Sequence, residues 1–260
     1  MDNSMLVFDR DAVRRHRDRA AGGMGAVADL LADIADRLLD RLDDTTRRFA
    51  TALDIGGRGV VEPMLRDRGI AVTGCDLSPV LVRASGASVV ADEEFLPFAA
   101  GSFDLVVASV SLHWVNDLPG ALLQIRRTLK PGGLFLASIP VLGTLDALRS
   151  SLTEAEAALT GGASPRVSPF PELRDCAHLL QRAGFAGPIV DLEEIRLLYR
   201  DPLALLRDLR AAGETNAVRL RDRRIPPRAL FPMALANLPQ MDGRVPVHLR
   251  LAMMTAWAPD

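Results

Sequence analysis

The stretch TALDIGGRG, residues 51–59, joins a short apolar run to an acid and three glycines. An apolar run that ends at Asp54 and passes through Gly56, Gly57 and Gly59 predicts a buried strand, a tight turn and a helix. Glycine accepts positive φ angles and has no side chain, so this turn would let a nucleotide-sized ligand lie against the main chain. A plain structural turn is the alternative, because a glycine-rich turn is weak support by itself. The sequence lacks G-x-G-x-x-G and the lysine-containing phosphate loop, which disfavours NAD and ATP.

β-rich and helical runs alternate on both sides of this turn, which indicates βαβ units in an α/β fold with a mostly parallel sheet and helices on both faces. We expect strands near residues 50–55, 71–75, 88–91, 104–110, 133–139, 189–198 and 250–257. Helices are expected near residues 60–68, 79–85, 118–129 and 171–183, with Lys130 in the last turn of the third. The last two strands resemble a hairpin interrupted by a long insertion.

The chain divides into an N-terminal part and one main domain. Residues 1–45 contain a charge-dense arm or lid, followed by an amphipathic helix with apolar residues at three- and four-residue intervals. Residues 46–260 form the α/β domain. Segments 143–170 and 200–245 carry too many helix and strand breakers for the sheet, and we expect them to be cap elements that cover the pocket.

Composition narrows the function classes. A chain of 260 residues with 48% hydrophobic content forms one large core, and its 33 acidic and 31 basic residues create no basic field for nucleic acid. No apolar run is long enough for an integral membrane segment, and the N-terminus lacks signal-peptide features. Cys75 and Cys176 predict neither a disulfide framework nor a zinc site. We therefore expect a cytoplasmic bacterial protein, at most peripheral to the inner membrane, of undetermined oligomeric state.

Asp76 ends the second expected strand, and we assign Asp76 and the following Leu77 to the cofactor site. A carboxylate at this position accepts hydrogen bonds from ribose hydroxyls in nucleoside-binding sheets. The alternative is that Asp76 caps the helix that begins at Ser78 and Pro79. Ser78 is the better cap, so we favour the ribose role for Asp76.

The stretch VVADEEFLPFAAGSFDLVVASVSLHWV, residues 89–115, resembles class I S-adenosylmethionine-dependent methyltransferases in the order of its acid, Leu-Pro-Phe and Phe-Asp elements. The resemblance implies a seven-strand Rossmann-like fold with S-adenosyl-L-methionine as cofactor. Its pocket would be built around Asp54 to Gly59, with the amino-acid end of the cofactor over the three glycines. The resemblance also implies that Asp92 holds the adenine amino group with Glu93 beside it. The strand end from Ser109 to Trp114 would then face the sulfonium and the substrate.

A closer resemblance covers nearly the whole chain. The sequences ADEEFLPF, SLHWVNDLPGAL, LKPGG, SPF, HLLQRAGF and the DL-x-x-x-GE-x-NA pattern from Asp208 to Ala217 resemble the family of mitochondrial complex I assembly factor 5 and its bacterial relatives. The malonyl carrier-protein methyltransferases share the core order with less of the insertion. One departure bears on the cofactor: the family turn usually reads D-x-G-x-G-x-G, and here it is one residue shorter.

His113 is the candidate catalytic residue, because a histidine at the pocket end of the fourth strand could orient or deprotonate a substrate. The alternative is that His113 and Trp114 simply pack under the cap. The resemblance implies a protein substrate, a subunit of complex I (NADH-quinone reductase). Arginine hydroxylation is the second hypothesis, although it commonly needs iron held by two histidines and a carboxylate, and we predict no metal ligands. The third hypothesis is a non-catalytic assembly factor that binds a partner through residues 206–232.

Overall fold

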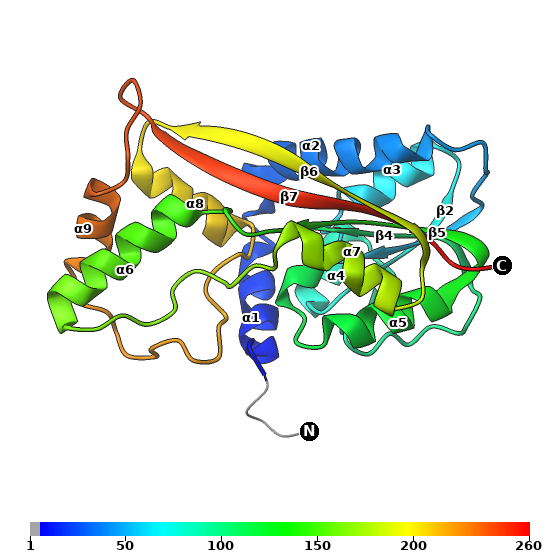
Figure 1. The fold of residues 1–260 in the computed structure, drawn as a ribbon, viewed down its shortest axis with the longest axis horizontal. Coiled ribbons are helices and arrows are strands. Elements are labelled where there is room, and N and C mark those ends of the chain that lie inside the picture. Colours follow the sequence, from blue (N-terminus) through cyan, green and yellow to red (C-terminus); the bar gives the residue numbers. More distant parts are fainter. Residues whose placement is uncertain (1–5) are drawn as a thin grey trace.

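A computed structural model describes residues 6–260, so the first five residues of the expected arm lie outside the described residues. The fold is a seven-stranded sheet in the order β3-β2-β1-β4-β5-β7-β6 (Figure 1). The strands are β1 Thr51–Ile55, β2 Ala71–Asp76, β3 Val89–Val90, β4 Phe103–Ser109, β5 Leu129–Pro140, β6 Ala186–Tyr199 and β7 Val245–Trp257. The first five run parallel, and β7 is antiparallel to both β5 and β6. All seven expected strands and the interrupted hairpin are confirmed.

Different helices cover the two faces of the sheet. One face packs against α5 (Leu118–Thr128) and α7 (Leu173–Arg182), and the other against α2 (Ala28–Leu39) and α3 (Val61–Asp67). In β5, Phe135 and Ile139 belong to the first core, whereas Leu134 and Leu136 belong to the second. Side chains alternate along a strand, so a continuous apolar run fits a strand that is covered on both faces.

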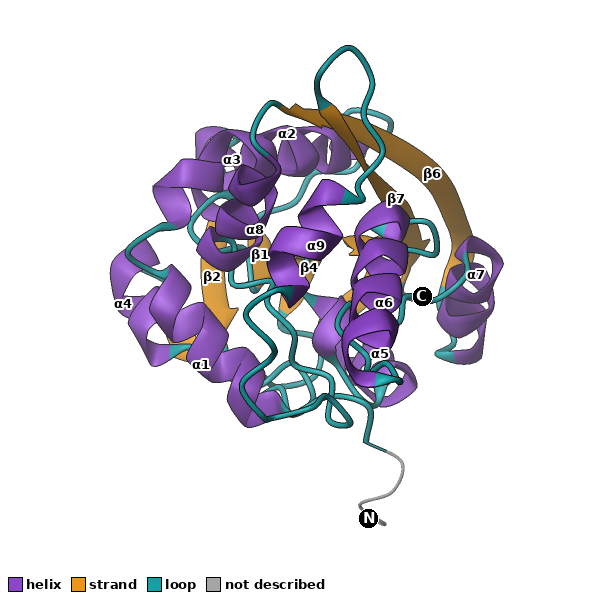
Figure 2. Cartoon of the chain, turned by 90° about the vertical axis from the view of Figure 1, so that its left-hand side faces the viewer, coloured by secondary structure: helices purple, strands orange, loops and turns teal. Residues whose placement is uncertain are grey.

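A third apolar cluster lies beyond one end of the parallel strands. This end of the molecule faces the viewer in Figure 2. The cluster contains α6 (Asp146–Thr160), α8 (Pro202–Ala211), α9 (Leu230–Ala236) and the beginning of β7. Leu148, Leu205, Leu230 and Val247 are buried in it. These elements come from the two segments that we expected to be cap elements.

The N-terminal helix α1 (Arg10–Ala20) lies across the end of the sheet where the parallel strands finish (Figure 1). Asp9 caps it, because its Oδ1 accepts a hydrogen bond from the Ala12 amide at 3.0 Å. The Asp9 amide in turn donates to the carbonyl of Ala217 at 2.8 Å. The arm is therefore held by the insertion between β6 and β7, and α4 (Pro79–Ser85) packs beside it.

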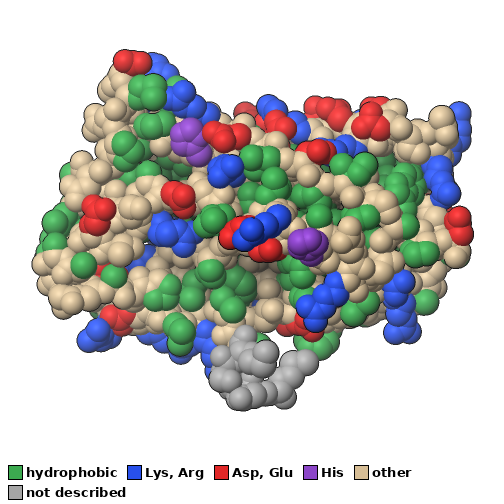
Figure 3. All heavy atoms as spheres, viewed as in Figure 1, with side chains coloured by type: hydrophobic (Ala, Val, Ile, Leu, Met, Phe, Trp, Pro, Cys, Tyr) green, Lys and Arg blue, Asp and Glu red, His purple; other side chains and the backbone are tan. Residues whose placement is uncertain are grey.

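The described surface has mixed charge. On the face drawn in Figure 3, acidic and basic side chains are interspersed, in keeping with the formal net charge of −2. Among residues 6–260, no helix combines the length and apolar character needed to cross a bilayer.

The expected placement of Lys130 at the end of a helix is wrong. α5 ends at Thr128, and Lys130 lies in β5, where its Nζ donates to Asp104 Oδ1 at 2.8 Å. Asp104 Oδ2 also accepts from the amide and hydroxyl of Thr51, at 2.9 and 2.8 Å. One carboxylate thus joins the beginnings of β1, β4 and β5. Burial raises the pKa of Asp104, but the bonds from Lys130 and Thr51 outweigh it and bring the pKa to about 2.

We predict that Asp104→Asn lowers the free energy of unfolding at pH 7 by about 1–3 kcal/mol, the range for hydrogen bonds to a charged group. A lowered folded-state pKa stabilises the protein above the unfolded value of about 3.9, and this contribution is lost as the pH falls toward about 2. Urea unfolding should therefore show the variant converging on the parent protein below about pH 4. Asp44→Asn, which changes an exposed acid, serves as the control and should leave stability unchanged.

Candidate functional site

Four acids gather at the carboxyl end of the parallel strands. Asp54 lies in β1, Asp76 is the last residue of β2, and Asp92 and Glu93 follow β3. Parallel strands end at the same edge of a sheet, which explains why residues far apart in the sequence meet here. We call these four residues the acid cluster. Asp54, Asp76 and Glu93 are buried.

Arg17 of α1 is buried within the acid cluster. Its Nη1 donates to Glu93 Oε1 at 2.6 Å and lies 3.3 Å from Asp76 Oδ2, and its side chain is 1% exposed. Its Nη2 donates to the carbonyl of Ser111 at 3.4 Å. Burial lowers the pKa of Arg17, but Asp76 and Glu93 outweigh it and raise the pKa above its usual value. The side chain therefore stays cationic.

Arg10 neutralises the outer part of the same cluster. Its Nη2 lies 2.6 Å from Asp92 Oδ1 and also pairs with Glu93, and its Nη1 donates to the carbonyl of Trp114 at 3.1 Å. Arg10 and Arg17 are seven residues apart and so share one face of α1. We had expected an arm or lid but did not assign these two arginines. Their seven-residue spacing within RDAVRRHRDRA was the available signal.

The acids of the cluster differ in charge compensation. Burial raises the pKa of Glu93, but Arg17 and Arg10 outweigh it and bring the pKa to about 2. Asp54 pairs with no cation among the described residues, and burial raises its pKa well above the usual range, with Glu62 and Asp76 adding to the effect. The cluster thus combines a carboxylate whose pKa two arginines lower with a carboxyl group whose pKa burial raises.

The glycine turn is tight against the protein itself. Gly56 and Gly59 have φ angles of 66° and 81°, and Arg58 between them has a φ of 53°. A Cβ on Gly56 would lie 2.6 Å from Ser111, and one on Gly57 would lie 2.0 Å from the Asp54 carboxylate. The backbone angles and these close approaches explain the glycines. Their expected contact with a cofactor remains a prediction.

The helix cap that we preferred is confirmed. Ser78 Oγ accepts from the Leu81 amide at 3.0 Å, with Pro79 in the first turn of α4. Asp76 Oδ1 accepts from the Ser78 amide at 2.7 Å, so its carboxylate is shared between this turn and Arg17. Its ribose role remains a prediction.

Two other predicted cofactor residues are Leu77, which follows β2, and Ser109, the last residue of β4. Leu77 packs against the apolar cluster of Phe8 and Trp114, and Ser109 Oγ lies 3.4 Å from Ser138 Oγ. Both have protein partners here, so the structure adds no support to their assignment.

Glu214 joins three of the motifs that stood out in the sequence, and we did not identify it beforehand. Its Oε2 lies 2.7 Å from both His113 Nε2 and Trp114 Nε1, and its Oε1 pairs with Arg58 of the glycine turn. Burial raises the pKa of Glu214, but His113 and Arg58 outweigh it and lower the pKa below its usual value. The GE in the DL-x-x-x-GE-x-NA pattern was the signal.

Buried polar atoms without a hydrogen-bond partner concentrate at this end of the sheet. Six of the ten such side-chain atoms in the described part of the chain belong to it: Arg17 Nε, Asp54 Oδ1, Arg58 Nε and Nη1, Ser111 Oγ and His113 Nδ1. Unsatisfied buried polar groups are rare and call for a functional or structural explanation. A polar ligand that contacts the glycine turn and the end of β4 fits these atoms.

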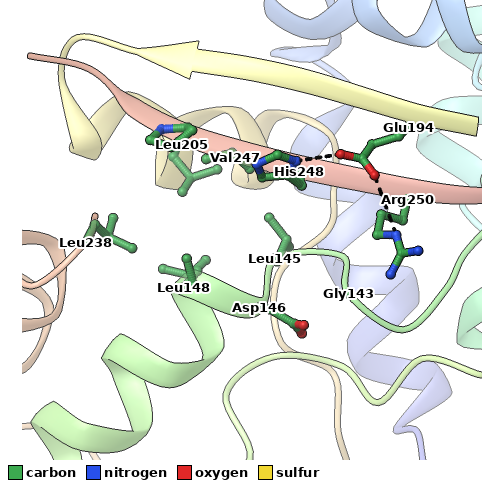
Figure 4. Close-up of a pocket in the computed structure, with 12 residues that line it drawn as sticks. Gly143, Leu145, Asp146, Leu148, Glu194, Leu205, Leu238, Val247, His248 and Arg250 are labelled. Carbon is green, nitrogen blue, oxygen red and sulfur yellow. Dashed lines mark hydrogen bonds and ion pairs between the residues drawn. The ribbon is translucent and has the colours of Figure 1, made fainter. Parts of the chain in front are cut away.

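A separate cavity of about 290 Å³ lies between the beginning of α6 and β7 (Figure 4). Its walls are largely aliphatic, and at its edge Glu194 lies 2.8 Å from His248 Nδ1 and 3.7 Å from Arg250. It shares no lining residue with the acid cluster. Among residues 6–260, no group of three His, Cys, Asp or Glu side chains is arranged to hold a metal ion.

Comparisons with known proteins agree with the fold. Residues 53–137 match a family described as a methyltransferase domain. The chain is 39% identical to the human protein named arginine-hydroxylase NDUFAF5, mitochondrial, over 98% of this chain and 77% of that protein. It is 33% identical to the malonyl-[acyl-carrier protein] O-methyltransferase of Methylovorus sp., over 100% of this chain and 93% of that protein. The YcgJ protein of Bacillus subtilis has a similar structure, with a TM-score of 0.59 and 14% identity over 86% of this chain and 98% of that one.

We predict that Arg17→Met lowers the free energy of unfolding by about 3–5 kcal/mol, because it leaves Asp76 and Glu93 buried without their cation. Arg14→Met is the matched control, since the Arg14 side chain is 42% exposed and pairs, among the described residues, only with Asp18 at the surface, and this change should cost less than about 1 kcal/mol. Urea unfolding at pH 7 measures both. Equal losses in the two variants would show that Arg17 is not holding the acid cluster together.

Proposed function

Since the chain belongs to the S-adenosylmethionine-dependent methyltransferase family, we propose that it transfers a methyl group from S-adenosylmethionine to a protein substrate. The observation that carries this proposal is the acid cluster beside the glycine turn, together with the unpartnered polar atoms around it. When bound, the cofactor supplies a methyl group already activated on a sulfonium. The protein has only to bind it, align a nucleophile and exclude water.

Three residues of the acid cluster have roles in this proposal. Asp76 accepts hydrogen bonds from the ribose hydroxyls, and Asp92 accepts from the adenine amino group with Glu93 beside it. These are the same oxygens that hold the guanidinium groups of Arg17 and Arg10. Cofactor and arginines therefore compete for one set of acceptors, and binding requires α1 to withdraw its side chains.

The substrate proposed is a subunit of complex I, by analogy with the relatives named arginine-hydroxylase NDUFAF5. Their similarity runs through 98% of this chain and includes the insertion that carries Glu214. We place the reaction in the bacterial cytoplasm, where a peripheral protein reaches a subunit before it joins the membrane complex.

One observation favours a second candidate, hydroxylation of an arginine side chain. The acid cluster already accommodates two guanidinium groups, one of them buried, so a substrate arginine fits the same carboxylates. Hydroxylation also requires a means of activating oxygen. We rank methyl transfer first because S-adenosylmethionine needs only the strand-end acids and the glycine turn to bind. Hydroxylation would need an additional group that activates oxygen.

We predict that calorimetry detects S-adenosylmethionine binding, and that Asp76→Asn and Asp92→Asn each weaken it at least about tenfold, equivalent to about 1.4 kcal/mol. Asp44→Asn provides a control of the same chemistry far from the site and should bind like the parent protein. Absent binding in the parent protein would contradict the proposal and favour a non-catalytic assembly factor. Binding that survives both substitutions would place the cofactor elsewhere.

We predict that Arg10→Gln tightens S-adenosylmethionine binding by about threefold or more. Removing a competing guanidinium raises the fraction of molecules in which Asp92 is available, and the apparent dissociation constant falls with that fraction. Arg14→Gln removes a cation of the same helix from outside the acid cluster and should leave affinity unchanged. Weaker binding in Arg10→Gln would indicate that Arg10 contacts the cofactor instead of excluding it.

A further inference from the structure

The contacts of Glu214 carry an inference about proton transfer, and this inference rests on the function proposed above. We propose that Glu214 is a positioning residue that fixes His113 in its Nε2–H tautomer and leaves Nδ1 as the proton acceptor of the site. The substrate nucleophile is then one that arrives carrying a proton, an amine, guanidine or hydroxyl group, and not a carboxylate.

The tautomer follows from the donors that surround Glu214. Burial raises the pKa of Glu214, but the charge of Arg58 and the hydrogen bonds from His113 and Trp114 lower it below its usual value, so the side chain is a carboxylate that only accepts hydrogen bonds. His113 Nε2, 2.7 Å from Glu214 Oε2, must therefore carry hydrogen. In a neutral imidazole the other nitrogen is then an acceptor. Trp114 Nε1 donates to the same oxygen at 2.7 Å, which limits rotation of the carboxylate.

His113 Nδ1, the nitrogen that Glu214 does not contact, is buried from solvent. His113 has a side chain that is 2% exposed, and its Nδ1 has no hydrogen-bond partner within residues 6–260. The ring of Phe170 lies 6.5 Å from that of His113, centroid to centroid, and the ring of Trp114 lies 5.3 Å away. A buried acceptor without a hydrogen-bond partner is costly, and a substrate proton would satisfy it.

The chemistry explains why this acceptor selects a class of substrate. A carboxylate is already deprotonated at neutral pH and needs no base to attack a methyl group. An amine, guanidine or hydroxyl group must lose a proton. In the proposed step that proton passes to Nδ1, the nucleophile's electron pair forms the bond to the methyl carbon, and the carbon–sulfur bonding pair remains on sulfur.

The contact between Glu214 and His113 depends on the insertion between β6 and β7, because that insertion carries Glu214. Glu214 follows α8, and its amide donates to the carbonyl of Leu209 at 2.8 Å. His113 follows β4, and Arg58 belongs to the glycine turn. The tautomer of His113 is thus fixed only when the insertion, the glycine turn and the end of β4 are in contact.

Nitrogen-15 NMR of histidine-labelled protein tests the tautomer without any cofactor. The chain has four histidines, and His113→Asn identifies the His113 signals by their loss. We expect a protonated Nε2, an unprotonated Nδ1 and a slowly exchanging low-field Nε2 proton. In Glu214→Met that proton signal should disappear and the two nitrogen shifts should move toward each other. Glu194→Gln is the matched control, because it alters the carboxylate at His248 and should leave His113 unchanged.

Glu214→Gln provides a second variant if the methionine variant does not fold. It keeps an acceptor oxygen but removes the charge, so the Nε2 proton should shift upfield without being lost. The proposal would be overturned if wild-type His113 were protonated at Nδ1, or if neither Glu214 substitution changed the His113 signals. Neither result depends on whether S-adenosylmethionine binds.

Methyl labelling tests the substrate class. Extract from cells lacking this protein is incubated with the purified protein and S-adenosylmethionine labelled in its methyl group. We expect a base-stable mark on protein, reduced at least about 100-fold in His113→Asn. A base-labile methyl ester would refute the substrate class while upholding methyl transfer. No label at all would refute the proposed function itself.

Discussion

The buried guanidinium of Arg17 is the constraint on which the arrangement of the site depends. Asp76 and Glu93 converge because parallel strands end together, and like charges so close are unfavourable without a cation. The cation comes from the N-terminal helix, which is distant in sequence from both acids. Its position ties α1 to the edge of the sheet, so any ligand that uses the same oxygens must also displace the helix side chains.

Glu214, in the C-terminal part of the chain, makes a second set of polar contacts at the same end of the sheet. It accepts from His113, Trp114 and Arg58, and so links the insertion to the end of β4 and to the glycine turn. The glycine turn takes part in this link through Arg58. Arg58 occupies the left-handed region at a φ of 53°, and its guanidinium reaches Glu214 and the carbonyl of Val110. The Arg58 side chain thus connects the glycine turn to the cap.

Sequence patterns predicted the sheet well and the polar contacts of the site poorly. The strands were found because apolar runs, glycines and prolines mark their ends locally. Lys130 was misplaced because β5 begins at Leu129, directly after α5, and the partner of the lysine, Asp104, lies on another strand. The acids were located correctly at the strand ends, but nothing local to Asp76 or Asp92 indicated that arginines of α1 would pair with them.

By itself the sequence determined the α/β class, the seven strands, the cap at Ser78 and the gathering of acids at one edge, because periodicity and turn chemistry act over a few residues. Only the tertiary structure decided which cation each acid receives and which nitrogen of His113 is held by Glu214. These pairings join residues 76 and 101 positions apart. Electrostatic pairing of that kind depends on distance in space, which the order of the chain does not specify.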